Sequence, residues 1–268
     1  MRFNFRKNIW YFLVFLCLIL IIGAYKFRVE LRYIISSVYY AFADQSSIVG
    51  YKRVTAFGIG IPRNFEVHGI DVSKYQGNIQ WEKLAKVNDN GLRISLAYIK
   101  ATESSNNIDS KFARNWKNAR KNNIVRGAYH FYNPNVNSAW QAKNFIRTVK
   151  LSEGDLPPVL DIEITGRYPA DNTRKGIKNW LRLIEAHYKV KPVIYTSLSF
   201  YLKYLNDDVF SEYPFWIAHY YKHRLFLDRS RWTFWQHSDK GRVDGINGKV
   251  DFNVFNGTRE DLNKLCVQ

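Results

Sequence analysis

The chain has 268 residues, of which 46% are hydrophobic and 24% charged, so it is long enough to bury a full core. Its net charge of +17 favours a polyanionic neighbour, such as nucleic acid, anionic lipid or an acidic wall polymer, without choosing among them. The two cysteines, Cys17 and Cys266, lie in an apolar run and near the C-terminus, so we expect no disulfide and exclude a disulfide-stapled fold.

The N-terminal segment predicts a membrane anchor. Basic residues precede residues 9–25, a run of 17 residues without a charge, which is the lower limit for a helix that spans a bilayer. A cleaved signal peptide is the alternative, because Ala41-Phe42-Ala43 has the form of a cleavage site, but this site lies far beyond the apolar run. We therefore expect a single-pass anchor at 1–25, a stalk or linker at 26–61, and a folded domain at 62–268 on the extracytoplasmic side of the cell membrane.

From residue 64 onward, strand and helix patterns alternate. Apolar, β-branched or aromatic runs predict eight strands, at 65–71, 95–102, 125–132, 158–163, 191–197, 215–220, 231–237 and 249–255. Helical patterns lie between the early ones, at 81–90, 110–122, 138–149 and 173–188, with a shorter one at 199–205. This alternation predicts a parallel sheet closed into an α/β barrel. The last three strands have short or irregular links, so we expect an incomplete helical ring.

The fourth predicted strand ends in two acids. Residues 156–163 read Leu-Pro-Pro-Val-Leu-Asp-Ile-Glu, and residues two apart on a strand project from the same face. The Cα atoms of Asp161 and Glu163 would then lie about 6.6 Å apart, close enough for each carboxylate to disturb the ionisation of the other. A glycosidase needs such a raised pKa to protonate a leaving sugar oxygen. Taken alone, the pair also fits a strand end whose acids cap the next loop.

In a barrel of this class, the active site forms at the C-terminal ends of the strands. These predicted ends carry acids, bases and aromatic residues: Asp71, Lys100, Glu103, His130, Tyr132, Asp161, Glu163, Tyr195, Trp216, His219, Tyr220, Trp235, Gln236 and His237, while the eighth strand contains Asp251. Carboxylates among aromatic rings at one rim are typical of a carbohydrate site.

The same segments carry a family resemblance over about residues 65–257. They read His68-Gly-Ile-Asp-Val-Ser-Lys-Tyr-Gln-Gly77, Tyr98-Ile-Lys-Ala-Thr-Glu103, Gly127-Ala-Tyr-His-Phe-Tyr132, Pro158-Val-Leu-Asp-Ile-Glu163, Pro192-Val-Ile-Tyr-Thr196, Trp216-Ile-Ala-His-Tyr220, Trp235-Gln236 and Val250-Asp-Phe-Asn253. The chain resembles the glycoside hydrolase family 25 lysozymes, the Chalaropsis-type N-acetylmuramidases. This resemblance implies a modified TIM-like barrel of eight strands with fewer helices.

The resemblance also implies a reaction and its residues. The expected reaction is hydrolysis of the β-1,4 bond between N-acetylmuramic acid and N-acetylglucosamine in peptidoglycan, without a cofactor. Glu163 matches the proton donor, and Asp161 matches the acid that assists the substrate's N-acetyl group. Asp71 and Asp251 match the other two acids of the family's site. Expected glycan contacts are Tyr132, Tyr195, Trp216, Tyr220, Trp235 and Lys100. Two positions depart from the family's usual Gly, namely Ser104 and Asn123.

Three alternatives stay open at this point. The first is a catalytically silent peptidoglycan-binding or scaffold protein on the same barrel. The second is a metal hydrolase that uses His68, His130, His219 and His237, although no His-x-His pair occurs and we expect no metal. The third is a nucleic-acid binder, but the basic residues are scattered and no binding motif is present, so we expect no nucleic acid. We expect a monomer whose partner is the peptidoglycan strand.

Overall fold

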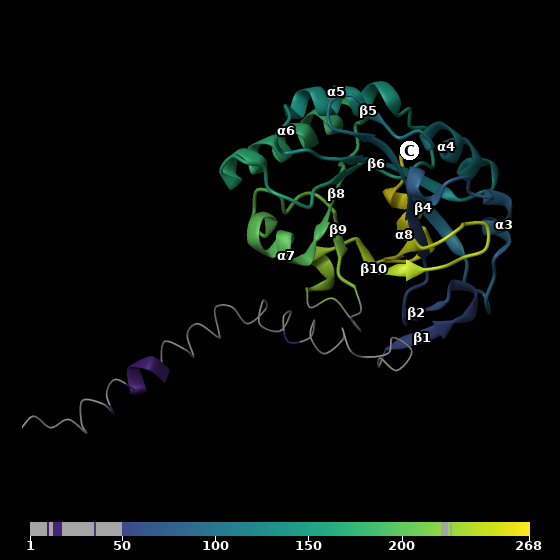
Figure 1. The fold of residues 1–268 in the computed structure, drawn as a ribbon, viewed down its shortest axis with the longest axis horizontal. Helices are drawn as coiled ribbons and strands as arrows, with labels where there is room; N and C mark the ends of the chain where they lie inside the picture. The colour runs from purple at the N-terminus through teal and green to yellow at the C-terminus, as the bar shows by residue number, and fades with distance from the viewer. Residues whose placement is uncertain (1–9, 11–12, 18–34, 36–49, 221–224, 226) are drawn as a thin grey trace, which may run out of the picture. The chain divides into compact units, whose positions relative to one another are not determined.

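The computed structural model describes residues 10, 13–17, 35, 50–220, 225 and 227–268 (Figure 1). Most of the predicted anchor and stalk, residues 1–49, lies outside the described residues, so the anchor stays a prediction. Within the described part, no helix has the length and apolarity to cross a membrane. The folded domain belongs to the second of two compact units, Ala43–Gln268.

Eight strands close into a barrel, as the sequence predicts. They are β3 (His68–Val72), β4 (Ile94–Glu103), β6 (Val125–Phe131), β7 (Val159–Asp161), β8 (Val193–Ser197), β9 (Phe215–Ala218), β10 (Phe234–Gly241) and β11 (Val250–Phe255). The ring closes because β3 pairs with β4 on one side and with β11 on the other. A short strand, β5 (Asn107–Ile108), folds back antiparallel onto the end of β4.

The barrel is mixed, not wholly parallel as expected. Strand β11 runs antiparallel to both β10 and β3. Residues 242–249 connect β10 to β11, and Gly245 and Gly248 turn there at positive φ. A parallel connection needs about a dozen residues or more, usually with a helix, so this short loop can only form an antiparallel return. The reversal places Asp251, at the start of β11, directly opposite Asp71.

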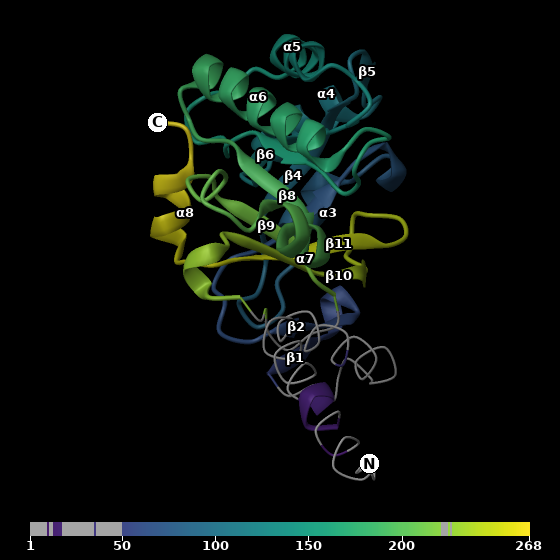
Figure 2. The ribbon, with the colours of Figure 1, turned by 90° about the vertical axis from the view of Figure 1, so that its left-hand side faces the viewer.

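The helical ring is incomplete, as predicted. Figure 1 shows the four main helices along one side of the barrel: α3 (Trp81–Lys86), α4 (Phe112–Lys121), α5 (Ser138–Thr148) and α6 (Ala170–Tyr188). After β8 comes only the short turn α7 (Leu198–Phe200) with a π-turn at Tyr201–Leu205, and before β10 a single turn at Arg229–Arg231. The last helix, α8 (Arg259–Leu265), was not expected. Its Leu262 joins the apolar cluster inside the barrel, and Figures 1 and 2 show the helix against one end of the strands.

A hairpin precedes the barrel within residues that the sequence assigned to a linker. Strands β1 (Tyr51–Val54) and β2 (Ile59–Pro62) pair antiparallel around a single 3₁₀ turn. The turn packs on the barrel: Phe57 is fully buried, and its ring centroid lies 4.9 Å from that of Phe252 on β11. The backbone N–H of Arg242 also donates to the Phe57 carbonyl oxygen at 2.9 Å. These short strands depend on contacts with β10 and β11, which no local pattern reveals.

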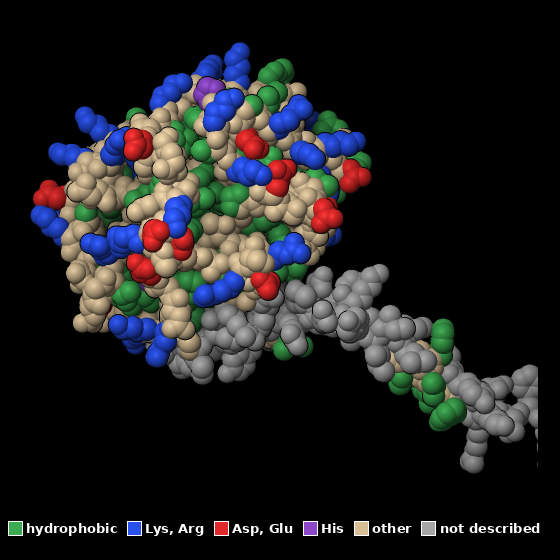
Figure 3. Space-filling model, turned by 180° about the vertical axis from the view of Figure 1, so that it is seen from behind, with side chains coloured by type: hydrophobic (Ala, Val, Ile, Leu, Met, Phe, Trp, Pro, Cys, Tyr) green, Lys and Arg blue, Asp and Glu red, His purple; other side chains and the backbone are tan. Residues whose placement is uncertain are grey.

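Alternation along the strands decides which side chains enter the barrel. Inward positions of six strands form one buried cluster, which includes Tyr98, Val159, Tyr195, Trp216 and Phe234. This cluster fills the barrel below its C-terminal rim and packs against the side chains at that rim. On the outside, Lys and Arg are spread among Asp and Glu on the face shown in Figure 3, rather than gathered in one patch.

Candidate active site

An open cavity of about 270 Å³ lies at the C-terminal ends of the barrel strands. It is lined by four acids, one lysine and a set of aromatic and polar residues: Asp71, Val72, Ser73, Tyr75, Gln76, Lys100, Tyr129, Phe131, Asp161, Glu163, Tyr195, Trp216, Tyr220, Gln236 and Asp251. All four acids that the resemblance singled out therefore meet in this cavity. Three of them come from strands, and Glu163 follows β7 by two residues.

Asp161 and Glu163 behave as a coupled pair. No N–H or O–H donor of the described chain reaches the buried Asp161 Oδ1, and the Glu163 carboxyl is the group within hydrogen-bonding distance of Asp161. A bond between two carboxyl groups requires a proton on one of them. Burial, with the charges of Glu163 and Asp71, raises the pKa of Asp161 well above its usual range. Burial also raises the pKa of Glu163, although the hydrogen bond with Asp161 lowers it, so the pair holds a proton when free carboxylates have lost theirs.

Asp71 and Asp251 form a second pair across β3 and β11. Burial raises the pKa of Asp71 to about 6, against the hydrogen bonds that it accepts from Asn253 and Gln236. Burial and the charge of Asp71 raise the pKa of Asp251 to about 8. Their carboxyl groups lie within hydrogen-bonding distance of each other. The cavity therefore gathers more carboxyl groups than can all be ionised at neutral pH.

Two amide side chains donate hydrogen bonds to Asp71. Gln236 Nε2 and Asn253 Nδ2 each donate to Asp71 Oδ2 at 2.8 Å. The hydroxyls of Tyr195 and Tyr220 both donate to Gln236 Oε1 at 2.7 Å. On the other side, Trp216 Nε1 donates to Asn253 Oδ1 at 2.8 Å. The sequence placed Gln236 at a strand end without assigning it a role, and it indicated Asn253 only as part of the motif Val250-Asp-Phe-Asn253.

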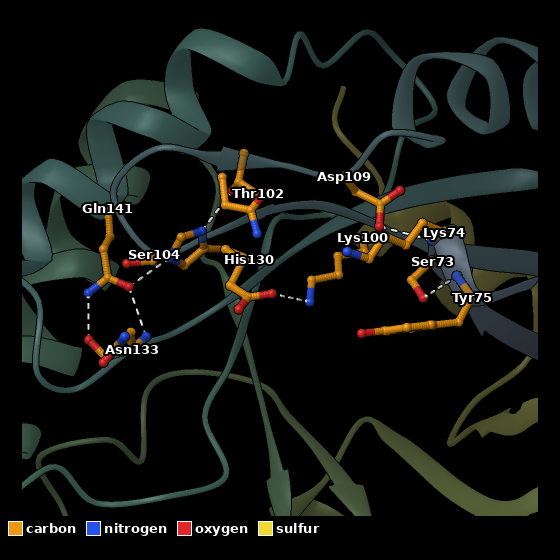
Figure 4. A network of polar contacts seen from close by, with 12 residues as sticks. Ser73, Lys74, Tyr75, Lys100, Thr102, Ser104, Asp109, His130, Asn133 and Gln141 are labelled. Carbon is orange, nitrogen blue, oxygen red and sulfur yellow. Dashed lines mark hydrogen bonds and ion pairs between the residues drawn. The ribbon is translucent and has the colours of Figure 1, made fainter.

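Lys100 is the basic residue in the cavity lining (Figure 4). Its Nζ lies 2.7 Å from Glu103 Oε2 and 4.6 Å from the centroid of the Phe131 ring. Its positive charge lowers the pKa values of Asp161 and Glu163, although less than burial raises them. Lys100 therefore limits how firmly the acid pair holds its proton.

The structure brings three of the five predicted aromatic residues to the cavity, namely Tyr195, Trp216 and Tyr220. It does not bring Tyr132 there: this residue follows β6 on the outward face, buried, with its hydroxyl against α6 at Gly176. Trp235 also faces outward from β10, where it packs on Phe65 and Trp232 and donates to the His219 carbonyl oxygen. Successive side chains along a strand point to opposite faces, so Tyr132 and Trp235 project away from the barrel interior.

The inward neighbours on the same strands line the cavity instead. Tyr129 and Phe131 of β6 enter it, which the alternation could have revealed, since residues 129 and 131 share the face opposite to that of residue 130. Tyr75 lies at the mouth with 80% of its surface exposed. Its loop is held by Ser73 Oγ, which accepts from the Tyr75 N–H at 3.3 Å, and by Asp109, which accepts from the Lys74 N–H at 2.9 Å (Figure 4).

Two of the four histidines near the strand ends, His68 and His130, form hydrogen bonds within the fold. His130 bonds Thr102 Oγ1 at 2.7 Å and Gln141 Oε1 at 3.1 Å, and it stacks on Trp180 of α6 (Figure 4). Burial lowers the pKa of both His130 and His68 to about 4, so both are neutral near pH 7. The described residues contain no group of three or more His, Cys, Asp and Glu with the geometry of a metal site.

Both departures from the family's usual glycines lie in the left-handed region of backbone space. Ser104 has φ of 54° and Asn123 has φ of 56°. Asn tolerates this conformation well, so Asn123 fits its position, as the sequence suggested. Ser104 follows the strand end that carries Glu103, and its carbonyl oxygen accepts from Asn144 of α5 at 3.2 Å, which supports the strained turn.

Comparison with known proteins places the chain among carbohydrate-active enzymes. The family model described as glycosyl hydrolases family 25 matches residues 70–246. "Lysozyme M1" of Streptomyces globisporus is 35% identical over 75% of this chain and 71% of its own. "Uncharacterized protein YegX" of Escherichia coli K12 is 45% identical over 98% of this chain and 95% of its own. A solved family 25 glycosyl hydrolase from Bacillus anthracis has a TM-score of 0.68 and 32% identity, covering 76% of this chain and 95% of its own.

Proposed function

The chain belongs to glycosyl hydrolase family 25 and is a lysozyme, and from this premise we propose that it cleaves the β-1,4 bond between N-acetylmuramic acid and N-acetylglucosamine in peptidoglycan. The observation that carries the proposal is the meeting of four carboxyl groups and several aromatic rings in one open cavity at the strand ends. Such a cavity offers an acid, a charge that stabilises the transition state, and apolar faces for sugar rings.

Glu163 is the proposed general acid. Burial raises its pKa, and through Glu163 the proton shared by the pair passes to the glycosidic oxygen as the bond to the anomeric carbon breaks, which leaves both Glu163 and Asp161 ionised. In the same step, the carbonyl oxygen of the substrate's own N-acetyl group attacks the anomeric carbon, and Asp161 orients that group and stabilises its developing positive charge. Water then attacks the anomeric carbon, the bond from that carbon to the N-acetyl oxygen breaks, and the water gives a proton to the Glu163 carboxylate, which restores the acid.

The glycan is held by the rings and the lysine of the cavity. We propose Tyr195, Trp216, Tyr220 and Lys100 as substrate contacts, together with Tyr75, whose exposed ring offers a stacking face at the mouth. The inward position of Phe131 adds a further apolar wall.

Glu163→Gln tests the assignment, because glutamine keeps the shape of the side chain and removes the proton that it transfers. We expect the rate of hydrolysis to fall at least about 1,000-fold, with glycan binding retained. The measurement is mass spectrometry of fragments released from purified peptidoglycan, in which a muramidase leaves muramic acid at the reducing end. The matched control is Glu153→Gln, a substitution of an exposed glutamate.

Full activity of Glu163→Gln would refute the role of Glu163, and fragments that end in glucosamine would refute muramidase specificity. A wild-type chain that binds peptidoglycan without releasing fragments or clearing a wall suspension would be a silent binding protein.

We also propose that the domain acts as a monomer on the extracytoplasmic side of the cell membrane. The uncharged run at residues 9–25 behind a basic N-terminus supports this location. Protease added to intact spheroplasts should then digest the domain while the membrane fraction keeps the N-terminal segment. Recovery of the whole chain in the soluble fraction would contradict the anchor.

A further inference from the structure

The orientation of Asn253 is determined by its neighbour. An indole N–H can only donate, so the atom of Asn253 that accepts from Trp216 must be its oxygen, Oδ1. The opposite atom, Nδ2, then has to face Asp71, to which it donates at 2.8 Å. Asn253 is 2% exposed and Trp216 is 2% exposed, so water does not compete for these bonds.

Gln236 is oriented in the same way from the other side. Two hydroxyls, those of Tyr195 and Tyr220, donate to its Oε1 at 2.7 Å, which turns its Nε2 toward Asp71. Both amides donate to one oxygen atom, Asp71 Oδ2. That oxygen accepts two hydrogen bonds and has no room for a proton of its own. Donors directed at a carboxylate favour its ionised form.

We propose that Gln236 and Asn253 are positioning residues that form an amide clamp, which keeps Asp71 ionised and leaves the shared proton of the Asp71–Asp251 pair on Asp251. The fixed charge of Asp71 then helps to hold a proton on the pair of Asp161 and Glu163. This last consequence rests on the proposed role of Glu163 as the acid. The clamp itself follows from the hydrogen bonds alone.

The pKa values of the two acids agree with a charge on Asp71 and a proton on Asp251. Asp71 has the lower pKa of its pair, about 6 against about 8 for Asp251, although Asp71 is the more buried. The charge of Asp71 in turn raises the pKa of Asp161. The other titratable groups that line the cavity are Asp161, Glu163, Lys100, Tyr75, Tyr129, Tyr195 and Tyr220. The charge of Asp239 on β10 also raises the pKa of Asp251.

Asn253→Leu and Gln236→Met test the clamp, because each is close to the native side chain in shape and removes the donor to Asp71 without adding a charge. Asn115→Leu is the matched control. Asn115 of α4 is fully buried and also accepts from an indole N–H, that of Trp81 at 3.2 Å, but it lies outside the cavity lining. This control therefore removes a similar buried amide without touching Asp71.

The primary measurement is a pH titration of the ¹³C carboxyl signals of the full-length chain, which needs no substrate. We expect the Asp71 midpoint to rise by about one pH unit or more in both clamp variants and to stay unchanged in Asn115→Leu. In the pH profile of kcat/KM for peptidoglycan, the acidic limb should move upward with it, and the maximum should fall at least about tenfold.

An unchanged Asp71 midpoint in a folded clamp variant would overturn the proposal, as would an equal shift in the Asn115→Leu control. If Asn253→Leu does not fold, Gln236→Met decides the question alone. A titration shift in a chain that releases no sugar would uphold the clamp and refute the proposed hydrolysis, so the two failures can be told apart.

Discussion

At the scale of single residues, burial is the main cause of the electrostatics of this site. It is the largest contribution to the raised pKa of Asp71, Asp161, Glu163 and Asp251 alike. Charge repulsion among the acids adds to burial, while amide donors and Lys100 oppose it. An acid that keeps its proton is useful for glycoside cleavage, but the folded state loses free energy whenever such a group is forced to ionise.

This cost predicts that Asp251→Asn stabilises the protein at high pH. The folded pKa of Asp251 is about 8 and its ordinary value is 3.8, so the folded state binds its proton more tightly than the unfolded state does. The stabilisation that comes from this tighter proton binding is complete below the ordinary pKa of Asp251, and it is lost as the pH rises through the pKa of the folded state. We expect the variant to gain about 1–2 kcal/mol in unfolding free energy at about pH 9 and almost nothing at about pH 4.

Thermal unfolding at a series of pH values measures this difference, and Glu153→Gln serves as the exposed control. A gain that is the same at every pH would mean that the variant acts through packing and not through ionisation.

At the scale of secondary structure elements, the alternation of side chains along a strand decides which residues face the cavity, and a position near the strand end is not sufficient. Along β6, Tyr129 and Phe131 face the cavity, while His130 faces the helices. Arg126 also faces outward, near the start of the strand. Its guanidinium donates to Asp155 at 2.7 and 3.1 Å and lies 3.9 Å from the ring centroid of Trp116 on α4. This contact ties β6 to the helix before it and to the loop after α5.

Arg126→Met should strongly destabilise the fold. The substitution leaves Asp155 buried without its partner, which costs about 3–5 kcal/mol when one member of a buried ion pair is removed. Lys191→Met is the matched control, because Lys191 pairs with Glu212 at 2.7 Å on the surface, where each side chain is about half exposed. Exposed pairs of this kind contribute about 0–1 kcal/mol.

Chemical denaturation of the two variants gives both values. Equal losses would show that the Arg126 pair contributes no more than a surface pair.

At the scale of the whole molecule, the ends of the domain complete the barrel. The hairpin of β1 and β2 packs on β10 and β11, while Leu262 of α8 and Cys266, which follows α8, join the interior cluster. Closure between β3 and β11 brings together residues that are 180 positions apart in sequence, Asp71 and Asp251. The site thus depends on the correct closure of the whole ring.

Phe57→Ala tests the contribution of the hairpin. Phe57 is fully buried against Phe252, so we expect a loss of about 3–5 kcal/mol in unfolding free energy, typical of a large-to-small change in a core. Ile108→Ala, at a side chain that is 52% exposed, is the control and should change stability little. Hydrolysis by the folded fraction should be unaffected. Equal stability of the two variants would show that residues 51–62 act as the linker that the sequence suggested.

Much of the site could be predicted from the sequence, and the reason is that its signals are local. The strand–helix order, the four acids and the family follow from periodicity and from motifs of a few residues each. The direction of β11, the packing of the hairpin and α8, and the outward positions of Tyr132 and Trp235 do not. They depend on which strands pair and which faces are buried, and these are set only when the ring closes. The same closure buries Asp71 among its amide donors and opposite Asp251, so only the tertiary structure decided the ionisation of this second pair, whereas the spacing of Asp161 and Glu163 already indicated that each perturbs the other.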